Sequence, residues 1–159
     1  PEEGAMVKEL LDDNGIGPGT GTDLFVMVEL PSNVIEAERF IQMMELSGGS
    51  IGSNDLVQTV YAVSRDDLEG YQNPVDARSP AVKSMIRQIV NKFNARGLEI
   101  GICGQAPSDF PEEFPPFLID CGISSISVTP DTAIAVRNTV AEAEKAAKKL
   151  TKQAELLSD

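Results

Sequence analysis

Short apolar runs alternate along the chain with amphipathic segments of helical period, and this alternation limits the possible folds more than any other feature. Four runs have the length and composition of strands, at residues 24–30, 49–53, 98–103 and 124–129. Each is followed by a segment that is typical of a helix. Alternating strands and helices joined by short loops predict a parallel sheet with right-handed crossovers. The sequence therefore predicts an α/β fold.

The helical segments complete four βα units. Helices are predicted over residues 1–14, 34–46, 55–64, from Ser79 to just before Gly97, and over 111–121 and 131–159. The expected core residues of two of them are Ile35, Phe40, Ile41 and Met44 in one, and Val82, Ile86, Ile89, Val90 and Phe93 in the other. Four βα units are half the repeat number of an eight-stranded barrel. We therefore predict a partial (βα)8 TIM-type barrel, a half-barrel preceded by one helix and ended by a long helix, with residues 1–159 forming a single domain.

A half-barrel needs a partner for its open side. The run at residues 24–30 is apolar throughout, as expected of a strand buried on both faces. Four such strands alone form a curved sheet with an open interior and two unpaired edges. The partner can be a preceding half-barrel or a second copy of the chain; alternatively the sheet can open into a flatter sandwich.

The last predicted helix offers a second surface for a partner. Its apolar residues have heptad-like spacing and are Val136, Val140, Ala143, Ala147, Leu150, Ala154 and Leu157. Such a stripe can pack on its own barrel or form a contact in a homo-oligomer. Both interpretations are compatible with the sequence.

Composition disfavours several functions. The formal net charge of -12 disfavours a nucleic-acid partner, because a phosphate backbone requires clustered Lys and Arg. No apolar run approaches the roughly 18 residues of a membrane-spanning helix, so no membrane partner is expected. The two cysteines are too few for a disulfide framework, and a reducing cytoplasm is the expected location.

Chemically capable side chains lie at the C-terminal ends of three predicted strands. Glu29 ends the first, Asp55 lies in the turn after the second, and Cys103 ends the third. Reactive groups of parallel α/β sheets gather at these ends. Two carboxylates are typical ligands of Mg²⁺. A thiol with an ordinary pKa of about 8.5 is mostly protonated near neutrality and can donate a proton to a carbanion.

Each of these residues also has an ordinary structural interpretation. Glu29 can be solvated or salt-bridged, Asp55 can cap the helix that follows, and Cys103 can be a small buried apolar residue. Cys121, just before Gly122, is expected to be structural. The occurrence of three such residues at equivalent strand ends favours a shared site.

The motifs around these residues resemble a known family. The segment GSIGSNDLVQTVYAVSRD, from Gly49 through Gln58 and Arg65, resembles the second signature of the phosphoenolpyruvate-utilising enzymes. The segments VELPSNVIEAERF and GICGQAPSDFPEEFPPFLIDCGISSISVTPDT are similar to the phosphoenolpyruvate synthase branch in particular. Pyruvate phosphate dikinases differ at residues 105–109. The same residues, 105–109, disfavour a third member of the superfamily, the enzyme that initiates phosphoenolpyruvate-dependent sugar phosphotransfer.

The resemblance implies roles for individual residues. It implies a catalytic (βα)8 barrel in which Glu29 and Asp55 bind Mg²⁺. Asn54, assisted by Ser53, would hold the carboxylate and phosphate region of pyruvate or phosphoenolpyruvate, and Glu29 would also contact the substrate. Cys103 would exchange a proton with the methyl or methylene carbon. The implied reaction converts ATP, pyruvate and water to phosphoenolpyruvate, AMP and phosphate through a phosphohistidine on another domain.

The chain departs from the whole family pattern. It has no histidine and no ATP-binding domain, so the phosphohistidine domain and the N-terminal half of the barrel are expected partners. We therefore expect the isolated chain to be inactive. A different class of function also stays open, a non-catalytic assembly module that acts through the exposed sheet edges and the last helix.

Overall fold

The computed structural model describes residues 1–64 and 75–158, with the side chains at 150–152 and 154–158 left out of the description. Arg65 and most of the polar segment that follows it lie outside the described residues. In chain order the elements are α1 (Glu2–Asp13), β1 (Phe25–Val28), α2 (Pro31–Ile35), α3 (Ala37–Met44), β2 (Gly48–Gly52), α4 (Ser53–Tyr61), α6 (Pro80–Ala95), β3 (Glu99–Cys103), α7 (Ala106–Asp109), α8 (Phe114–Cys121), β4 (Ser125–Ile126) and α9 (Ala133–Ser158).

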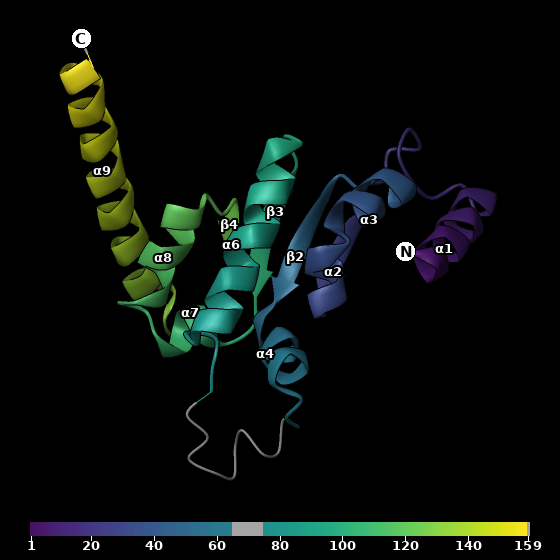
Figure 1. The fold of residues 1–159 in the computed structure, drawn as a ribbon, viewed down its shortest axis with the longest axis horizontal. Helices are drawn as coiled ribbons and strands as arrows, with labels where there is room; N and C mark the ends of the chain where they lie inside the picture. Colours follow the sequence, from purple (N-terminus) through teal and green to yellow (C-terminus); the bar gives the residue numbers. More distant parts are fainter. Residues whose placement is uncertain (65–74, 159) are drawn as a thin grey trace.

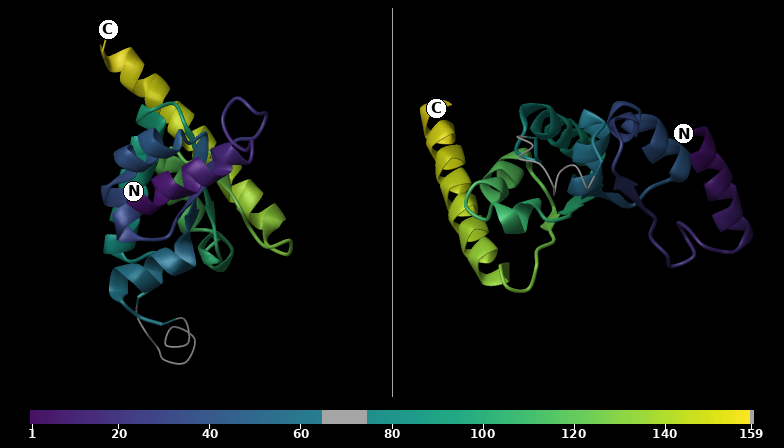
Figure 2. Two further views of the ribbon diagram at one scale, coloured as in Figure 1. Left: turned by 90° about the vertical axis from the view of Figure 1, so that its right-hand side faces the viewer. Right: turned by 90° about the horizontal axis from the view of Figure 1, so that it is seen from below.

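The four strands form one parallel sheet in the order β1-β2-β3-β4, so each strand pairs with its neighbour in the sequence. Because all strands point the same way, their C-terminal ends share one edge, which lies at the lower side of Figure 1 beside α4 and α7. Seen from below in the right panel of Figure 2, the helices are arranged across the sheet in chain order, from α1 at one side to α9 at the other. The predicted half-barrel of four βα units behind one helix is confirmed.

The two faces of the sheet differ in burial. One face packs against the helices and carries Val28, Ile51 and Ile102, none of which is more than 1% exposed. The other face carries Phe25 and Met27, which are 54% and 44% exposed. The prediction that the first strand is buried on both faces is therefore wrong, because no described element covers the concave side.

Small residues line this concave face. A Cβ atom added at Gly48 would meet the ring of Phe25, and one added at Gly101 would meet the hydroxyl of Ser125. Side chains of the neighbouring strands therefore lie flat across these glycines. Across the sheet, Gly48 lies between Phe25 and Glu99, and Ser50 and Gly101 lie between Met27 and Ser125. The described part of this face therefore has no continuous apolar layer.

Helix α6 is the centre of the core. Ser79 occupies its N-cap position and Pro80 its first turn, as the sequence predicts. All the core residues predicted for it are buried: Val82, Ile86, Ile89, Val90 and Phe93. Phe93 packs directly beneath β2, where a Cβ atom at Gly49 would lie 3.0 Å from the ring.

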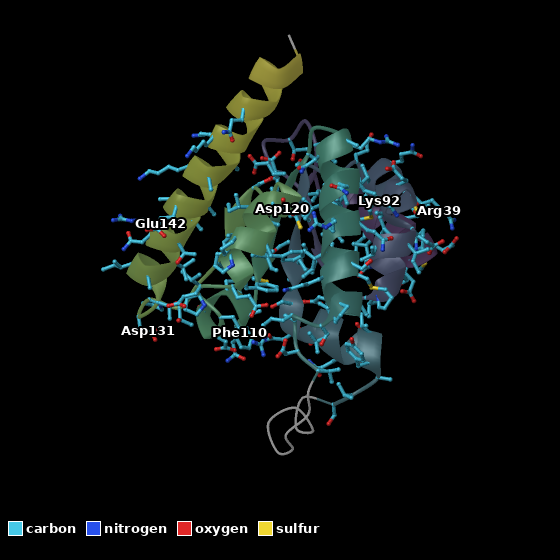
Figure 3. The ribbon with its side chains drawn as sticks, turned by 60° about the vertical axis from the view of Figure 1, so that its left-hand side comes forward. Arg39, Lys92, Phe110, Asp120, Asp131 and Glu142 are labelled. Atoms are coloured by element: carbon cyan, nitrogen blue, oxygen red, sulfur yellow. The ribbon has the colours of Figure 1, made fainter. Side chains whose placement is uncertain are left out.

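The helix predicted over residues 34–46 is interrupted at Glu36 and forms α2 and α3. The ammonium group of Lys92 on α6 donates to the carbonyls of Val34 and Ile35 at 2.6 and 3.0 Å. In a continuous helix these carbonyls would instead accept hydrogen bonds from backbone N–H groups four residues later. Figure 3 shows Lys92 on the side of α6 that faces these helices. Val34 enters the core, whereas Ile35 is 69% exposed, so the prediction of a core position for Ile35 is wrong.

The C-terminal unit has a short strand and a long helix. Only Ser125–Ile126 of the predicted strand at 124–129 pairs with β3. Helix α9 packs on α8, with Val136 only 3% exposed, and extends beyond the sheet in Figure 1. This packing agrees with the first interpretation at the start of the heptad-like stripe, whereas Ala147 further along it is exposed; a homo-oligomer contact stays a prediction.

None of the helices in the described ranges has the length and apolar character that crossing a membrane would require.

Candidate active site

The C-terminal ends of β1, β2 and β3 meet in what we call the mouth, made of residues 29, 52–55 and 103–105. Gly52 pairs with Cys103, and Ile51, one residue earlier, pairs with Val28. Glu29 follows Val28, so it reaches the same level of the sheet as Gly52 and Cys103. By the alternation of strand side chains, Glu29 lies on the concave face with Phe25 and Met27.

Glycine at position 52 makes room for the side chain of Glu29. A Cβ atom on Gly52 would lie 2.6 Å from Oε1 of Glu29 and 2.6 Å from its Cγ. The Glu29 carboxylate therefore extends across the end of β2, in the direction of β3. Any side chain at position 52 would displace it.

The turn after β2 is bonded to the end of β3. Ser53, which begins α4, is fully buried, and its hydroxyl donates to the carbonyl of Cys103 at 2.9 Å. The side-chain oxygen of Asn54 accepts the backbone N–H of Gln105 at 3.4 Å. Gly104 has a positive φ of 102° and packs so closely on Ser53 that a Cβ atom could not be accommodated. These contacts fix Asn54 and Cys103 relative to each other.

The two carboxylates of the mouth differ in exposure. Glu29 is half-buried, whereas Asp55 is exposed in the first turn of α4, with Gln58 Nε2 donating to its Oδ1 at 3.3 Å. Within residues 1–64 and 75–158, neither carboxylate forms an ion pair with a lysine or arginine. Their oxygens are hard donors of the kind that Mg²⁺ prefers. A group of three or more His, Cys, Asp or Glu side chains able to hold a metal does not occur among the described residues, so the mouth offers two carboxylates at most.

The two cysteines have different environments. Cys121 is buried in α8, and burial raises the pKa of its thiol. A buried thiol with a raised pKa is chemically inert, in agreement with the structural role expected for this residue. Cys103 is half-buried at the mouth. Of the two, only Cys103 is placed to meet a molecule at the strand ends.

Arg78, just before α6, is the centre of a charged cluster outside the mouth. Its guanidinium group lies 2.8 Å from the carboxylate of Asp76, 3.4 Å from that of Glu113 and 3.7 Å from the centre of the Phe110 ring. Burial by itself raises the pKa of Asp76, but the hydrogen bonds and charge of Arg78 outweigh it, so the pKa is below its usual value. Figure 3 shows Phe110 at the lower end of the molecule, where the strands end. The sequence pattern does not predict this cluster, because Glu113 lies 35 residues from Arg78 in the chain.

The structure thus brings together the residues that the sequence singled out. Glu29, Ser53, Asn54, Asp55 and Cys103 all lie in the mouth. Two glycines and two polar residues that support them, Gly52, Gly104, Asn33 and Thr59, were not predicted. Gly52 carried a signal as part of the turn motif, and Gly104 as part of the segment that begins GICG.

A parallel half-barrel with its polar residues at the C-terminal strand ends defines the class: an α/β-barrel domain whose candidate site lies where such barrels carry their chemistry. The sequence model of the family described as "PEP-utilising enzyme, PEP-binding domain" matches residues 3–145. The chain belongs to this family.

Curated relatives agree over most of the chain. Phosphoenolpyruvate synthase from Aquifex aeolicus is 44% identical over 146 residues, which are 91% of this chain and 17% of that protein. The enzyme of the same name from Synechocystis is 43% identical over 92% of this chain and 18% of its own length, and the one from Escherichia coli is 36% identical over 91% and 18%. The chain therefore spans less than a fifth of the relatives it matches.

A solved structure supports the fold. An HpcH/Hpal aldolase/citrate lyase family protein from Burkholderia cenocepacia aligns with a TM-score of 0.50 and 19% identity, covering 82% of this chain and 43% of that protein. At this identity the likeness concerns the fold alone. Coverage of less than half of the longer protein agrees with a partial barrel.

Proposed function

We propose that the chain is the C-terminal half of the catalytic barrel of a pyruvate, water dikinase, an enzyme of the phosphoenolpyruvate synthase type. In this proposal the mouth binds pyruvate or phosphoenolpyruvate together with Mg²⁺, and the chemistry takes place in the cytoplasm. Glu29 and Asp55 hold the metal, Ser53 and Asn54 position the substrate, and Cys103 is the proton donor or acceptor.

The observation that carries the proposal is the convergence of these side chains at one edge. Glu29 extends over Gly52, and Gly52 pairs with Cys103. The Ser53 hydroxyl and the Asn54 amide are bonded to the backbone of the same β3 end. A small molecule held beside Asn54 would therefore touch both the carboxylate from β1 and the thiol from β3.

The donors at the mouth fit a magnesium ion. Two carboxylates without lysine or arginine partners in the described ranges leave most of an octahedral coordination shell for water and substrate oxygens, which is how Mg²⁺ is commonly bound. When bound, Mg²⁺ supplies positive charge that offsets the negative charge developing on the substrate oxygens. The half-burial of Glu29 and the exposure of Asp55 would place the ion at the rim of the mouth, open to a substrate.

The remaining residues act on the substrate itself. The side-chain oxygen of Asn54 bonds to Gln105, and its amide nitrogen, which has no hydrogen bond among the described residues, would donate to the substrate. As a thiolate, Cys103 would take a proton from the methyl group of pyruvate; in the reverse direction its thiol would give a proton to the methylene carbon of the enolate that remains after phosphoenolpyruvate has transferred its phosphoryl group. The half-buried thiol can meet this carbon while the surrounding strand ends restrict access by water.

The other parts of the enzyme would come from further segments of a longer polypeptide. The relatives named phosphoenolpyruvate synthase are more than five times as long as the matched region. A cavity of 270 Å³ beside the unpaired edge of β4, lined by Ile126, Val128 and Val136 among others, supports the proposal that another element packs there. We propose that this element belongs to the N-terminal half of the barrel, and that a phosphohistidine domain delivers the phosphoryl group.

A titration with oxalate, a planar anion similar in shape to enolised pyruvate, tests the site. We expect NMR amide shifts at residues 52–55 and 103–105 of the 159-residue chain when oxalate is added with Mg²⁺, and none with oxalate alone. Glu29→Gln and Asp55→Asn should each weaken the binding by at least about tenfold, because each removes one of two charged ligands. Glu99→Gln is the matched control, since Glu99 is an exposed carboxylate at the opposite end of β3.

Three outcomes would contradict the proposed site. They are the absence of any Mg²⁺-dependent shift, shifts located away from the mouth, and an effect of Glu99→Gln equal to that of Glu29→Gln. If no Mg²⁺-dependent binding is found, the chain is better explained as an assembly module.

The isolated chain should not make phosphoenolpyruvate. It contains no histidine to carry the phosphoryl group, and positioning of that group is most of the catalysis in phosphoryl transfer. We expect no product when the chain is incubated with ATP, pyruvate and Mg²⁺ and followed by ³¹P NMR. Formation of phosphoenolpyruvate that depends on ATP would show that the proposed division of labour is wrong.

A further inference from the structure

The peptide that joins Glu29 to Leu30 is held at both ends by side chains. The Glu29 carbonyl accepts a hydrogen bond from the hydroxyl of Thr59 at 2.7 Å. The Leu30 N–H donates to Oδ1 of Asn33 at 3.0 Å, and the Glu29 N–H donates to the same atom at 3.2 Å. Past the end of β1 this backbone has no strand partner in the ladder, so the two side chains replace the sheet.

Helix capping explains the hydrogen bonds of Asn33, whereas the bond from Thr59 to Glu29 is not one that a helix requires. Asn33 lies in the first turn of α2 and satisfies the N–H of Leu30, the N-cap residue, which any helix start requires. Thr59 lies in the last turn of α4, and a threonine hydroxyl in a helix commonly bonds to the carbonyl four residues earlier. That carbonyl, of Asp55, is 2.9 Å away and that of Leu56 is 3.1 Å away, so the contact to Glu29 is the shortest of the three.

The hydroxyl of Thr59 therefore touches the backbone of both proposed metal ligands. It contacts the carbonyl of Glu29 from β1 and the carbonyl of Asp55 from α4. We infer that Thr59 is a positioning residue, which fixes the Glu29 segment against α4 and thereby sets the spacing between the two carboxylates. The inference about metal affinity rests on the proposed function, whereas the restraint on the Glu29–Leu30 peptide does not.

The experiment compares Thr59→Val with Thr59→Ser in the 159-residue chain. Valine keeps the shape of threonine and removes the hydroxyl, whereas serine keeps the hydroxyl and removes the methyl group. Thr139→Val is the matched control, because the one hydrogen bond of the Thr139 side chain among the described residues goes to the carbonyl of Ala135 in its own helix, α9. Two quantities are measured: the exchange rate of the Leu30 amide without metal, by NMR, and the affinity for Mn²⁺, by electron paramagnetic resonance.

We expect Thr59→Val to speed the exchange of the Leu30 amide about fivefold, the effect of losing one ordinary hydrogen bond. It should also weaken Mn²⁺ binding by about tenfold, as loss of a group that orients a metal ligand does. Thr59→Ser should stay within about twofold of the parent chain in both measurements, and so should Thr139→Val.

The outcomes separate the inference from the proposed function. If the parent chain binds no Mn²⁺, or if Glu29→Gln binds it equally well, the proposed metal site is wrong, while faster Leu30 exchange in Thr59→Val would still support the restraint. If Mn²⁺ binding depends on Glu29 but is unchanged in Thr59→Val, the positioning role is overturned. It is also overturned if Thr59→Ser loses as much affinity as Thr59→Val, because the hydroxyl would then not be responsible.

Discussion

Replacing Phe93 with alanine is expected to lower the free energy of unfolding by about 3–5 kcal/mol, the usual effect of removing a buried phenylalanine ring. Phe93 is 1% exposed and fills the space between α6 and β2. Because Gly49 contributes no side chain above it, β2 cannot fill the space that the ring leaves. Urea unfolding followed by circular dichroism measures the change.

Phe25→Ala provides the matched control for this experiment. The ring of Phe25 is 54% exposed on the concave face, so its removal should cost less than about 1.5 kcal/mol, since little of its area is withdrawn from water. Equal losses in the two variants would mean that the concave face is covered in solution and that the core is not centred on α6.

Replacing Gly104 with alanine should destabilise the mouth by about 2–4 kcal/mol, from backbone strain together with overpacking. At its φ of 102° an alanine is strained, and the added Cβ would meet the Ser53 hydroxyl and lie 3.2 Å from Oδ1 of Asn54. Ser53 is fully buried and has no room to retreat. We expect loss of the hydrogen bond from Ser53 to Cys103 and, with it, weaker Mg²⁺-dependent oxalate binding.

Gly97→Ala separates strain from crowding. Gly97 also has a positive φ, of 67°, but nothing lies within 4 Å of a Cβ atom there. Its replacement should therefore cost about 1–2 kcal/mol from the left-handed backbone alone. Urea unfolding of both variants gives the comparison, and an equal effect at the two positions would show that the Gly104 contact with Ser53 is not a tight one.

Much of the fold follows from local sequence pattern. The spacing of Val82, Ile86, Ile89 and Phe93 predicts the face of α6 that is buried, because a helix of this length has a single apolar stripe. The pattern at residues 24–30 failed for a tertiary reason. An apolar run does not reveal whether both faces of its strand are covered, and here Phe25 and Met27 meet no described element.

Interactions between distant segments account for the other failures. Ile35 is in register for the core of a continuous helix, but Lys92, 57 residues away in the chain, bonds to its carbonyl, and the helix is interrupted there. Asn33 and Thr59 support the candidate site by hydrogen bonds to backbone atoms, which any residue possesses. No motif records such bonds, so the polar side chains at the strand ends could be predicted and their supports could not.

The order of the strands has a consequence for how the molecule opens. Helix α1 packs mainly on α3, and α9 packs mainly on α8 and α7, so in the described part of the chain the main helix contacts of each outer unit are with units close to it in the sequence. Losing an outer unit removes its own contacts and leaves β2, β3 and α6 packed together. We therefore expect local unfolding to begin at the two outer units, as it does at the ends of a stacked-repeat protein. A closed eight-stranded barrel has no outer unit at which unfolding could begin.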